Sequence, residues 1–298
     1  MSMHEPLKKE SVALNVEGVV LDVATMHRRG EGPPIVFLHG FGSTKEDYAD
    51  IAHYPALGGR PVIAYDAPGC GDTCCANLSK VSIPFLVATA KAVLAHFGVD
   101  RFHLVGHSMG GLTALMLAHE SPQRIASFID IEGNVAPEDC FLSRQAGDYP
   151  SADTQSFFDD FIERNWHSPY YSAALYASNL RHNVRADAVR GIFTSMVELS
   201  DHGDLMAKFL SLPFPRMFMY GEQNASLSYL VGPAKLGFVR GRLGAFIRWP
   251  CTFRTQAVVG GASKVPREAL WRLRSHSRTK NTGASPRRTI ARSNQRRL

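Results

Sequence analysis

Gly106-His107-Ser108-Met109-Gly110 is the stretch that decides the predicted fold of this chain. It follows the apolar run at residues 102–105 and precedes a helical pattern over residues 112–119. Between a strand and a helix, a G-x-S-x-G pentapeptide holds its serine in a sharp turn with the hydroxyl exposed for attack. The glycines are required because side chains at those positions would collide as strand and helix close together. The context therefore predicts a nucleophilic Ser108, and a glycine-rich structural turn is the alternative.

Strand patterns continue on both sides of this turn. Period-two runs at residues 12–16 and 19–23 flank Glu17-Gly18 and predict a hairpin at a sheet edge. Short apolar runs predict further strands, buried on both faces, at 35–38 and 62–65. Residues 125–131 are predicted as another strand.

Helical patterns separate these strands. Residues 82–97 carry an apolar face and are closed by Gly98, which predicts a helix. Ser43 and Glu46 have the spacing of a capping box, which predicts a shorter helix through Tyr48. Strand alternating with helix predicts an α/β fold with a doubly wound, mostly parallel sheet, whose active site gathers at the carboxyl ends of the strands.

The strand pattern stops after residue 134. Four segments then look helical, namely 156–166, 169–180, 186–200 and 204–210. An all-helical insertion between two strands is typical of a lid, and the apolar run 217–220 returns the chain to the sheet. We therefore expect four parts: a core at 1–134, a helical lid at 135–212, a return to the core at 213–230, and a basic, atypical tail at 231–298 in which the last strand and helix are missing or replaced.

Four motifs occur in a family-specific order. They are His39-Gly40-Phe41-Gly42, Tyr65-Asp66-Ala67-Pro68-Gly69-Cys70-Gly71, the glycine-flanked turn at 106–111, and Tyr220-Gly221-Glu222. Over about residues 12–230 the chain resembles the α/β-hydrolase superfamily, in its lid-bearing serine hydrolase branch of esterases, C–C hydrolases and epoxide-hydrolase-like proteins. The resemblance implies the α/β-hydrolase fold and hydrolysis of an ester-type or related carbonyl bond. The chain has no metal-ligand spacing or phosphate loop, so we expect neither metal nor cofactor.

Attack on a carbonyl places negative charge on its oxygen, which two backbone N–H groups can stabilise. By similarity to the family these are the amides of Phe41 and Met109. We also expect His39, Gly40 and His107, which are close to these positions or to Ser108 in the sequence, to line the substrate pocket, together with Trp166 of the lid. His107 is interpreted as a site-lining or packing residue rather than the base. Aromatic side chains crowd the lid, and we expect an apolar or aromatic acyl substrate, although helical spacing of aromatics is also typical of packing. They are Phe157, Phe158, Phe161, Trp166, Tyr170, Tyr171 and Tyr176.

A serine nucleophile needs a base, and the base needs a carboxylate. In the resembling family the acid usually ends the strand after the lid, in a Gly-x-x-Asp pattern, but this chain has Asn224 there. Some members carry the acid at the end of the preceding strand, where this chain offers Glu132. We therefore predict Glu132 as the acid, with Glu222 as the alternative. Asp130 and Asp66 are interpreted as carboxylates that support the structure.

The base is the missing element. The resemblance implies a Gly-His pair some 25 to 30 residues after the acid position, yet no histidine lies between Asn224 and His276. His276 itself lies in a basic stretch without a preceding strand pattern, and it is the alternative base. If no base is present, the chain is a non-catalytic, hydrolase-like binding protein.

Charge divides the chain at the same place. From Val231 onward there are 16 Lys and Arg against one acid, a net of +15, whereas the preceding residues sum to −9. Such a composition is typical of a change of reading frame in a GC-rich gene. The alternatives are a basic extension that binds nucleic acid or an acidic membrane surface, and a tail that supplies His276.

Composition fits an intracellular enzyme. No apolar run approaches the length of a membrane span, and the polar N-terminus lacks the apolar centre of a secretory signal. The five cysteines have no framework spacing and are expected to be free thiols. We therefore expect a cytoplasmic protein with a small-molecule substrate and no clear nucleic-acid partner.

Overall fold

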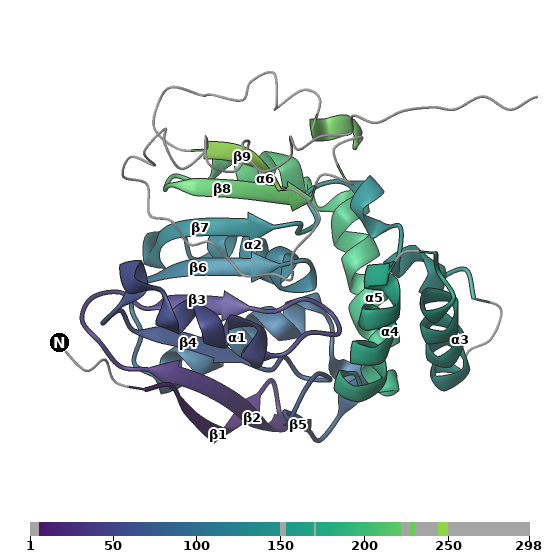
Figure 1. Ribbon diagram of the computed structural model, residues 1–298, viewed down its shortest axis with the longest axis horizontal. Coiled ribbons are helices and arrows are strands. Elements are labelled where there is room, and N and C mark those ends of the chain that lie inside the picture. Colours follow the sequence, from purple (N-terminus) through teal and green to yellow (C-terminus); the bar gives the residue numbers. More distant parts are fainter. Residues whose placement is uncertain are drawn as a thin grey trace, which may run out of the picture. The chain divides into compact units, whose positions relative to one another are not determined.

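A computed structural model describes residues 6–149, 153–169, 171–221, 224, 227–230 and 244–249. Its described strands form one sheet in the order β1-β2-β4-β3-β6-β7-β8-β9, with β5 paired to β2 (Figure 1). The strands are β1 (Lys8–Val16), β2 (Val19–Arg28), β3 (Ile35–Leu38), β4 (Val62–Tyr65), β5 (Cys74–Cys75), β6 (Phe102–His107), β7 (Ile125–Ile131), β8 (Arg216–Gly221) and β9 (Gly244–Trp249). The pairs from β4 through β9 are parallel, which confirms a mostly parallel sheet.

The antiparallel edge is the predicted hairpin. β1 and β2 pair from Lys8 with His27 to Val16 with Val19, so only Glu17 and Gly18 remain in the turn. Both turn residues have positive φ, 51° and 82°. That is the conformation of a two-residue turn whose twist matches the strands.

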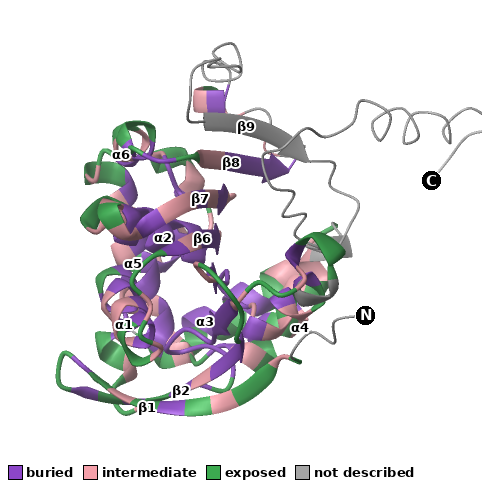
Figure 2. Cartoon of the chain, turned by 90° about the vertical axis from the view of Figure 1, so that its left-hand side faces the viewer, coloured by how far each residue is buried: buried purple, intermediate pink, exposed green. Residues whose placement is uncertain are grey.

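The two faces of the sheet are covered by different elements. Along β3, Val36 and Leu38 join the apolar core that includes α1 (Ile83–His96) and α2 (Met109–Glu120). Phe37 points the other way because side chains alternate along a strand. Its ring stacks on Tyr48 with centroids 4.6 Å apart. Figure 2 shows α1 and α2 lying along the first face.

The sequence signals for helix ends are confirmed at α1 and wrong at residues 43–46. Ser82 caps α1, since its Oγ accepts a hydrogen bond from the Phe85 amide at 3.4 Å. The shorter helix is a 3₁₀ helix, η1 (Lys45–His53), that begins after Thr44 without a side-chain cap. The Lys45 amide instead donates to Asp66 Oδ1 at 2.7 Å, so a carboxylate from another loop replaces the capping box.

The described helices between residues 137 and 211 connect β7 to β8. The α-helices are α3 (Thr154–Trp166), α4 (Tyr171–Asn183), α5 (Ala186–His202) and α6 (Leu205–Ser211). The 3₁₀ helices of the described chain besides η1 are η2 (Pro55–Leu57), η3 (Leu78–Lys80), η4 (Pro122–Arg124), η5 (Pro137–Cys140) and η6 (Ser143–Ala146). In Figure 1, α3, α4 and α5 lie beyond the carboxyl ends of the parallel strands. Phe157, Phe161 and Phe193 are buried there and contact one another edge to face or tilted.

The sheet continues past the point where the sequence indicated that it ends. We expected the last strand to be missing or replaced after residue 230, but β9 pairs in parallel with the whole of β8. The strand includes the short apolar run Ala245-Phe246-Ile247, and the arginines and glycines on both sides of this run conceal it when composition alone is considered. The rest of residues 231–298, with Cys251 and His276, lies outside the described residues.

No helix within the described ranges is long and apolar enough to cross a membrane. The four described cysteines, Cys70, Cys74, Cys75 and Cys140, are free.

Candidate active site

Ser108 occupies a strained turn between β6 and α2. Its backbone has φ 51° and ψ −118°, a conformation that costs a non-glycine residue about 1–3 kcal/mol. Two hydrogen bonds hold it there: its amide donates to Ile131 O at 2.9 Å, and its carbonyl accepts from the Leu112 amide at 3.0 Å. The turn therefore fixes Ser108 at the amino end of α2 and at the carboxyl end of β6.

The flanking glycines are required by close backbone contacts. A Cβ atom on Gly106 would lie 2.4 Å from Gly110 O, and one on Gly110 would lie 2.2 Å from Leu38 O. Both distances are far below van der Waals contact, so strand, turn and helix could not close with larger residues. This is the packing that the pentapeptide predicted.

The 39–42 loop lies directly against the turn. A Cβ on Gly40 would meet His107 Nδ1 at 2.7 Å, and a Cβ on Gly110 would meet His39 O at 2.5 Å. The residues predicted for an oxyanion hole, Phe41 and Met109, therefore come from two segments in contact. Met109 is the first residue of α2, where the helix dipole favours negative charge.

The side chain of His39 connects this loop to the loop after β4. Its Nε2 accepts a hydrogen bond from the Ala67 amide at 2.8 Å, which leaves Nδ1–H to donate to Gly40 O at 2.8 Å. The side chain is buried, and burial lowers the pKa of His39. Both ring nitrogens are occupied by backbone groups, so the ring positions the loop as a neutral imidazole.

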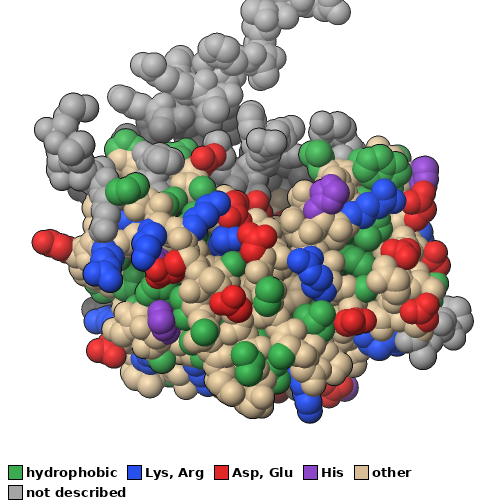
Figure 3. Space-filling model, turned by 90° about the horizontal axis from the view of Figure 1, so that it is seen from below, with side chains coloured by type: hydrophobic (Ala, Val, Ile, Leu, Met, Phe, Trp, Pro, Cys, Tyr) green, Lys and Arg blue, Asp and Glu red, His purple; other side chains and the backbone are tan. Residues whose placement is uncertain are grey.

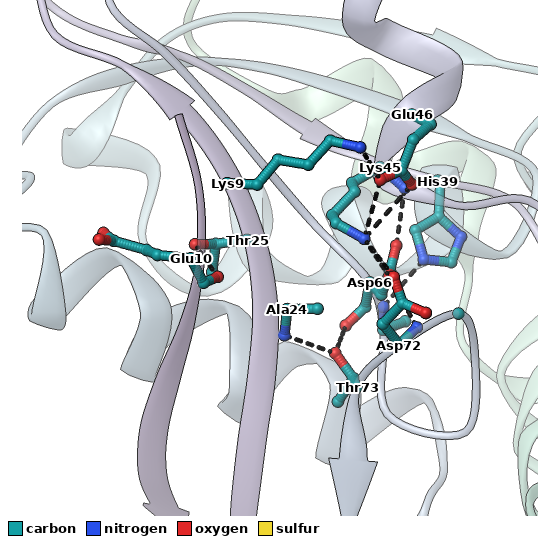
Figure 4. A network of polar contacts seen from close by, with 12 residues as sticks. Lys9, Glu10, Ala24, Thr25, His39, Lys45, Glu46, Asp66, Asp72 and Thr73 are labelled. Atoms are coloured by element: carbon teal, nitrogen blue, oxygen red, sulfur yellow. Dashed lines mark hydrogen bonds and ion pairs between the residues drawn. The ribbon is translucent and has the colours of Figure 1, made fainter. Parts of the chain in front are cut away.

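Asp66 joins the 39–45 loop to the loop after β4 (Figure 4). Its Oδ1 accepts from the Lys45 amide, and its Oδ2 accepts from Lys45 Nζ at 2.7 Å and from the Asp72 amide at 2.9 Å. Burial alone would lower the pKa of Lys45, but hydrogen bonds to Asp66 and Glu46 outweigh it and raise that pKa. The structural interpretation of Asp66 is confirmed, whereas the buried Lys45 had no signal in the sequence.

Glu132 lies at the end of the strand next to Ser108. The pairing of His107 with Ile131 brings the residues that follow each of them to the same edge. The Glu132 backbone has φ 53°, and its amide donates to Met219 O at 2.8 Å. Its Oε1 accepts from the Gly221 amide at 2.7 Å and from Asn224 Nδ2 at 2.8 Å. The carboxylate therefore bridges the carboxyl ends of β7 and β8.

Asp130 is the other carboxyl group beneath the turn. It is fully buried, and its Oδ1 accepts from the Gly133 amide at 2.9 Å. Its Oδ2 has no hydrogen-bond partner among the described residues. Burial raises the pKa of Asp130 well above its ordinary value, so the group is stabilised in its protonated form. As a neutral, buried acid, Asp130 stabilises the structure around the Ser108 turn. It does not provide the negative charge that would stabilise a protonated base.

The remaining predicted site residues are spread over the chain. His107 is half-buried, and burial lowers the pKa of His107 although the charge of Glu132 opposes this. Trp166 ends α3 with 46% of its surface exposed, and the Arg181 guanidinium lies 5.6 Å from its ring centre. The alternative acid Glu222 and the alternative base His276 lie outside the described residues.

The helical segment covers the 39–42 loop. Phe41 is buried, with its ring centre 4.8 Å from that of Phe193 in α5 and 6.5 Å from that of Phe158 in α3. Asn183 at the end of α4 donates to Gly42 O at 3.0 Å. These contacts bring the aromatic side chains of the segment next to the site.

Comparison with solved structures supports the same fold. An N-acyl homoserine lactonase, AidH, aligns over 83% of this chain and 89% of its own with a TM-score of 0.61 and 17% identity. A thermophilic esterase from Thermogutta terrifontis aligns over 81% of this chain and 90% of its own with a TM-score of 0.59 and 18% identity.

Sequence relatives match shorter segments. A pimeloyl-[acyl-carrier protein] methyl ester esterase from Aeromonas hydrophila is 36% identical over 121 residues, which is 40% of this chain and 44% of the esterase. A 2-hydroxy-6-oxo-6-phenylhexa-2,4-dienoate hydrolase from Burkholderia cepacia is 30% identical over 131 residues, 43% of this chain and 46% of the hydrolase. The chain thus spans less than half the length of either curated relative.

The family comparison covers more of the chain. The family described as alpha/beta hydrolase fold matches residues 33–218, which include the 39–42 loop, the Ser108 turn, β7 and the helical segment. Since this match extends over more than half of the sequence and agrees with the sheet order and the elbow, the chain belongs to the alpha/beta hydrolase fold family.

Proposed function

We propose that this protein is a serine hydrolase acting on an ester-type or related carbonyl bond. The observation that carries the proposal is the strained backbone of Ser108, held at φ 51° between β6 and α2 with Glu132 at the neighbouring strand end. Strain of this kind persists only where the surrounding structure imposes it, and it concentrates at functional sites.

The reaction follows from the roles of the side chains and amides. Ser108 Oγ attacks the carbonyl carbon and passes its proton to a histidine, and the oxygen becomes an oxyanion bound by the Phe41 and Met109 amides. The histidine then protonates the leaving group. A water molecule, activated by the same base, hydrolyses the acyl-enzyme and releases Ser108.

Glu132 supplies the carboxylate that orients the histidine and stabilises its charged form. We assign the base to His276, since it is the histidine that follows β8 in the sequence. The chain order is then serine, acid, histidine, as in other proteins with this nucleophile elbow. Glu222 is the alternative acid.

The proposed substrate is a small apolar or aromatic acyl compound. Two observations support it: the buried aromatic side chains of α3 and α5 pack on Phe41, and two of the relatives are named for an acyl methyl ester and for a phenyl-substituted dienoate. Residues 135–212 are proposed to act as the lid over this pocket.

Labelling with a fluorophosphonate, together with turnover of p-nitrophenyl esters, tests the proposal. We expect covalent labelling at Ser108 and loss of turnover by about 10³-fold or more in Ser108→Ala. Ser79→Ala is the matched control, because Ser79 is an exposed residue of η3. Saturable binding of an ester without labelling would instead indicate a non-catalytic binding protein. His276→Ala tests the base, and wild-type turnover in that variant would overturn its assignment.

A further inference from the structure

The side chain of Asn224 lies where the family pattern has its acid, and it contacts the carboxylate that we propose as the acid. Asn224 Nδ2 donates to Glu132 Oε1 at 2.8 Å, and the Gly221 amide donates to the same oxygen at 2.7 Å. The two donors belong to β8 and the residues after it, whereas Glu132 follows β7. One oxygen of Glu132 is therefore fixed from the neighbouring strand.

From this geometry we propose that Asn224 is a positioning residue for Glu132, and that the carboxylate and the amide are exchangeable between the two positions. The inference rests on the proposed function, because it gives Asn224 a role only if Glu132 orients a catalytic base. In this proposal, Asn224 occupies the position of the family's usual acid, and its side-chain amide orients the carboxylate of Glu132, which acts as the acid instead.

The backbone at Glu132 explains why such a donor is needed. Glu132 adopts a left-handed conformation, φ 53°, which glutamate reaches at a cost of about 1 kcal/mol or more. A glutamate also has more rotatable bonds than an aspartate, so its carboxylate needs external hydrogen bonds to hold one orientation. Gly221 and Asn224 provide two, and a charged acceptor makes each of them stronger than a neutral pair.

The exchange follows from the chemistry of the pair. A carboxylate at 224 and an amide at 132 would form the same short contact with donor and acceptor reversed. Changing Asn224 to aspartate alone would place two carboxylates within hydrogen-bond distance, where like charges repel or must share a proton. Changing Glu132 to glutamine alone would leave two amides and no acid.

Ester turnover in four variants tests the exchange. Relative to wild type, we expect kcat/KM to fall about 10⁴-fold in Glu132→Gln, and about 10-fold to 100-fold in Asn224→Ala, the effect of one hydrogen bond to a charged group. In Asn224→Asp the acidic limb of the pH profile should move to higher pH. The double variant Glu132→Gln with Asn224→Asp should regain at least 10-fold over Glu132→Gln. Asn77→Ala is the surface control, since Asn77 is exposed.

If the Glu132–Asn224 contact contributed only to stability, the double variant would not regain turnover. Each single change would then lower stability, and combining them would not restore catalysis. A double variant no more active than Glu132→Gln overturns the exchange.

A second measurement does not depend on turnover. The side-chain amide resonances of Asn224 should shift in Glu132→Gln and stay in place in Glu138→Gln, since Glu138 bonds to Ser228 instead. Unchanged resonances in Glu132→Gln would overturn the positioning role. If wild type has no ester turnover while these resonances shift, the proposed function fails and the Glu132–Asn224 contact stands.

Discussion

Three buried polar side chains near Ser108 are stabilised in three different ways. His39 is a neutral imidazole bound between two backbone groups, and Asp66 is a carboxylate paired with Lys45. Asp130 lacks both a cation and a second hydrogen-bond partner within the described part of the chain, so burial favours its neutral form. The charge of Asp66 is thus balanced by Lys45, whereas Asp130 is neutral because it binds a proton.

Asp130 makes the protein less stable as pH rises. Burial raises its folded pKa well above the unfolded value, so above about pH 4 the folded chain binds a proton that the unfolded chain has released. Stability is then lost with rising pH, by at most about 1.4 kcal/mol per pH unit, until the folded pKa is passed. We expect the gain in Tm from Asp130→Asn, relative to wild type, to grow between pH 5 and pH 7, as measured by thermal denaturation. A gain independent of pH would show that Asp130 does not titrate in this way.

At the scale of elements, the strands of the sheet were the most predictable part. Residues 35–38 and 62–65 match β3 and β4 because parallel strands covered on both faces are continuous apolar runs. The start of η1 was not predictable, since its first amide is satisfied by Asp66 from a loop 21 residues away rather than by Ser43. Contacts between distant loops leave no local pattern.

The candidate site also has a part that the sequence predicts and a part that it does not. The Ser108 turn could be predicted from its glycines, because their role is steric and local. The Asn224–Glu132 contact could not, since it depends on the register of β7 beside β8. The missing aspartate of the Gly-x-x-Asp pattern was a signal of change in the sequence, but only the structure shows that Asn224 at that position contacts Glu132.

Lys45 connects two loops, and we expect its removal to destabilise both. Lys45→Met would leave the buried carboxylate of Asp66 without its cation, a change that costs about 3–5 kcal/mol. The matched control is Lys91→Met, because Lys91 and Glu120 form an ion pair with both side chains about two-fifths exposed. That change should cost less than about 1 kcal/mol. Urea denaturation measures both, and similar losses in the two variants would contradict the role assigned to Lys45.

For the whole molecule, charge is distributed unevenly along the sequence. Figure 3 shows Lys and Arg interspersed with Asp and Glu on the face seen from below. The basic excess instead lies in the residues after Val231.

Buried and half-buried histidines make the folded protein sensitive to mild acid. Burial lowers the pKa of His39, His103 and His107, with the charges of Arg60 and Arg101 adding to the effect at His103. Below about pH 6.5 the unfolded chain binds protons that the folded chain excludes, so stability is present above that pH and is lost as pH falls through the folded values. We expect Tm to fall between pH 7 and pH 5 in the Asp130→Asn background, which removes the opposing titration. Adding His103→Gln should make this decline shallower, because unfolding then takes up about one proton fewer. An equally steep decline in that variant would assign the acid sensitivity to other groups.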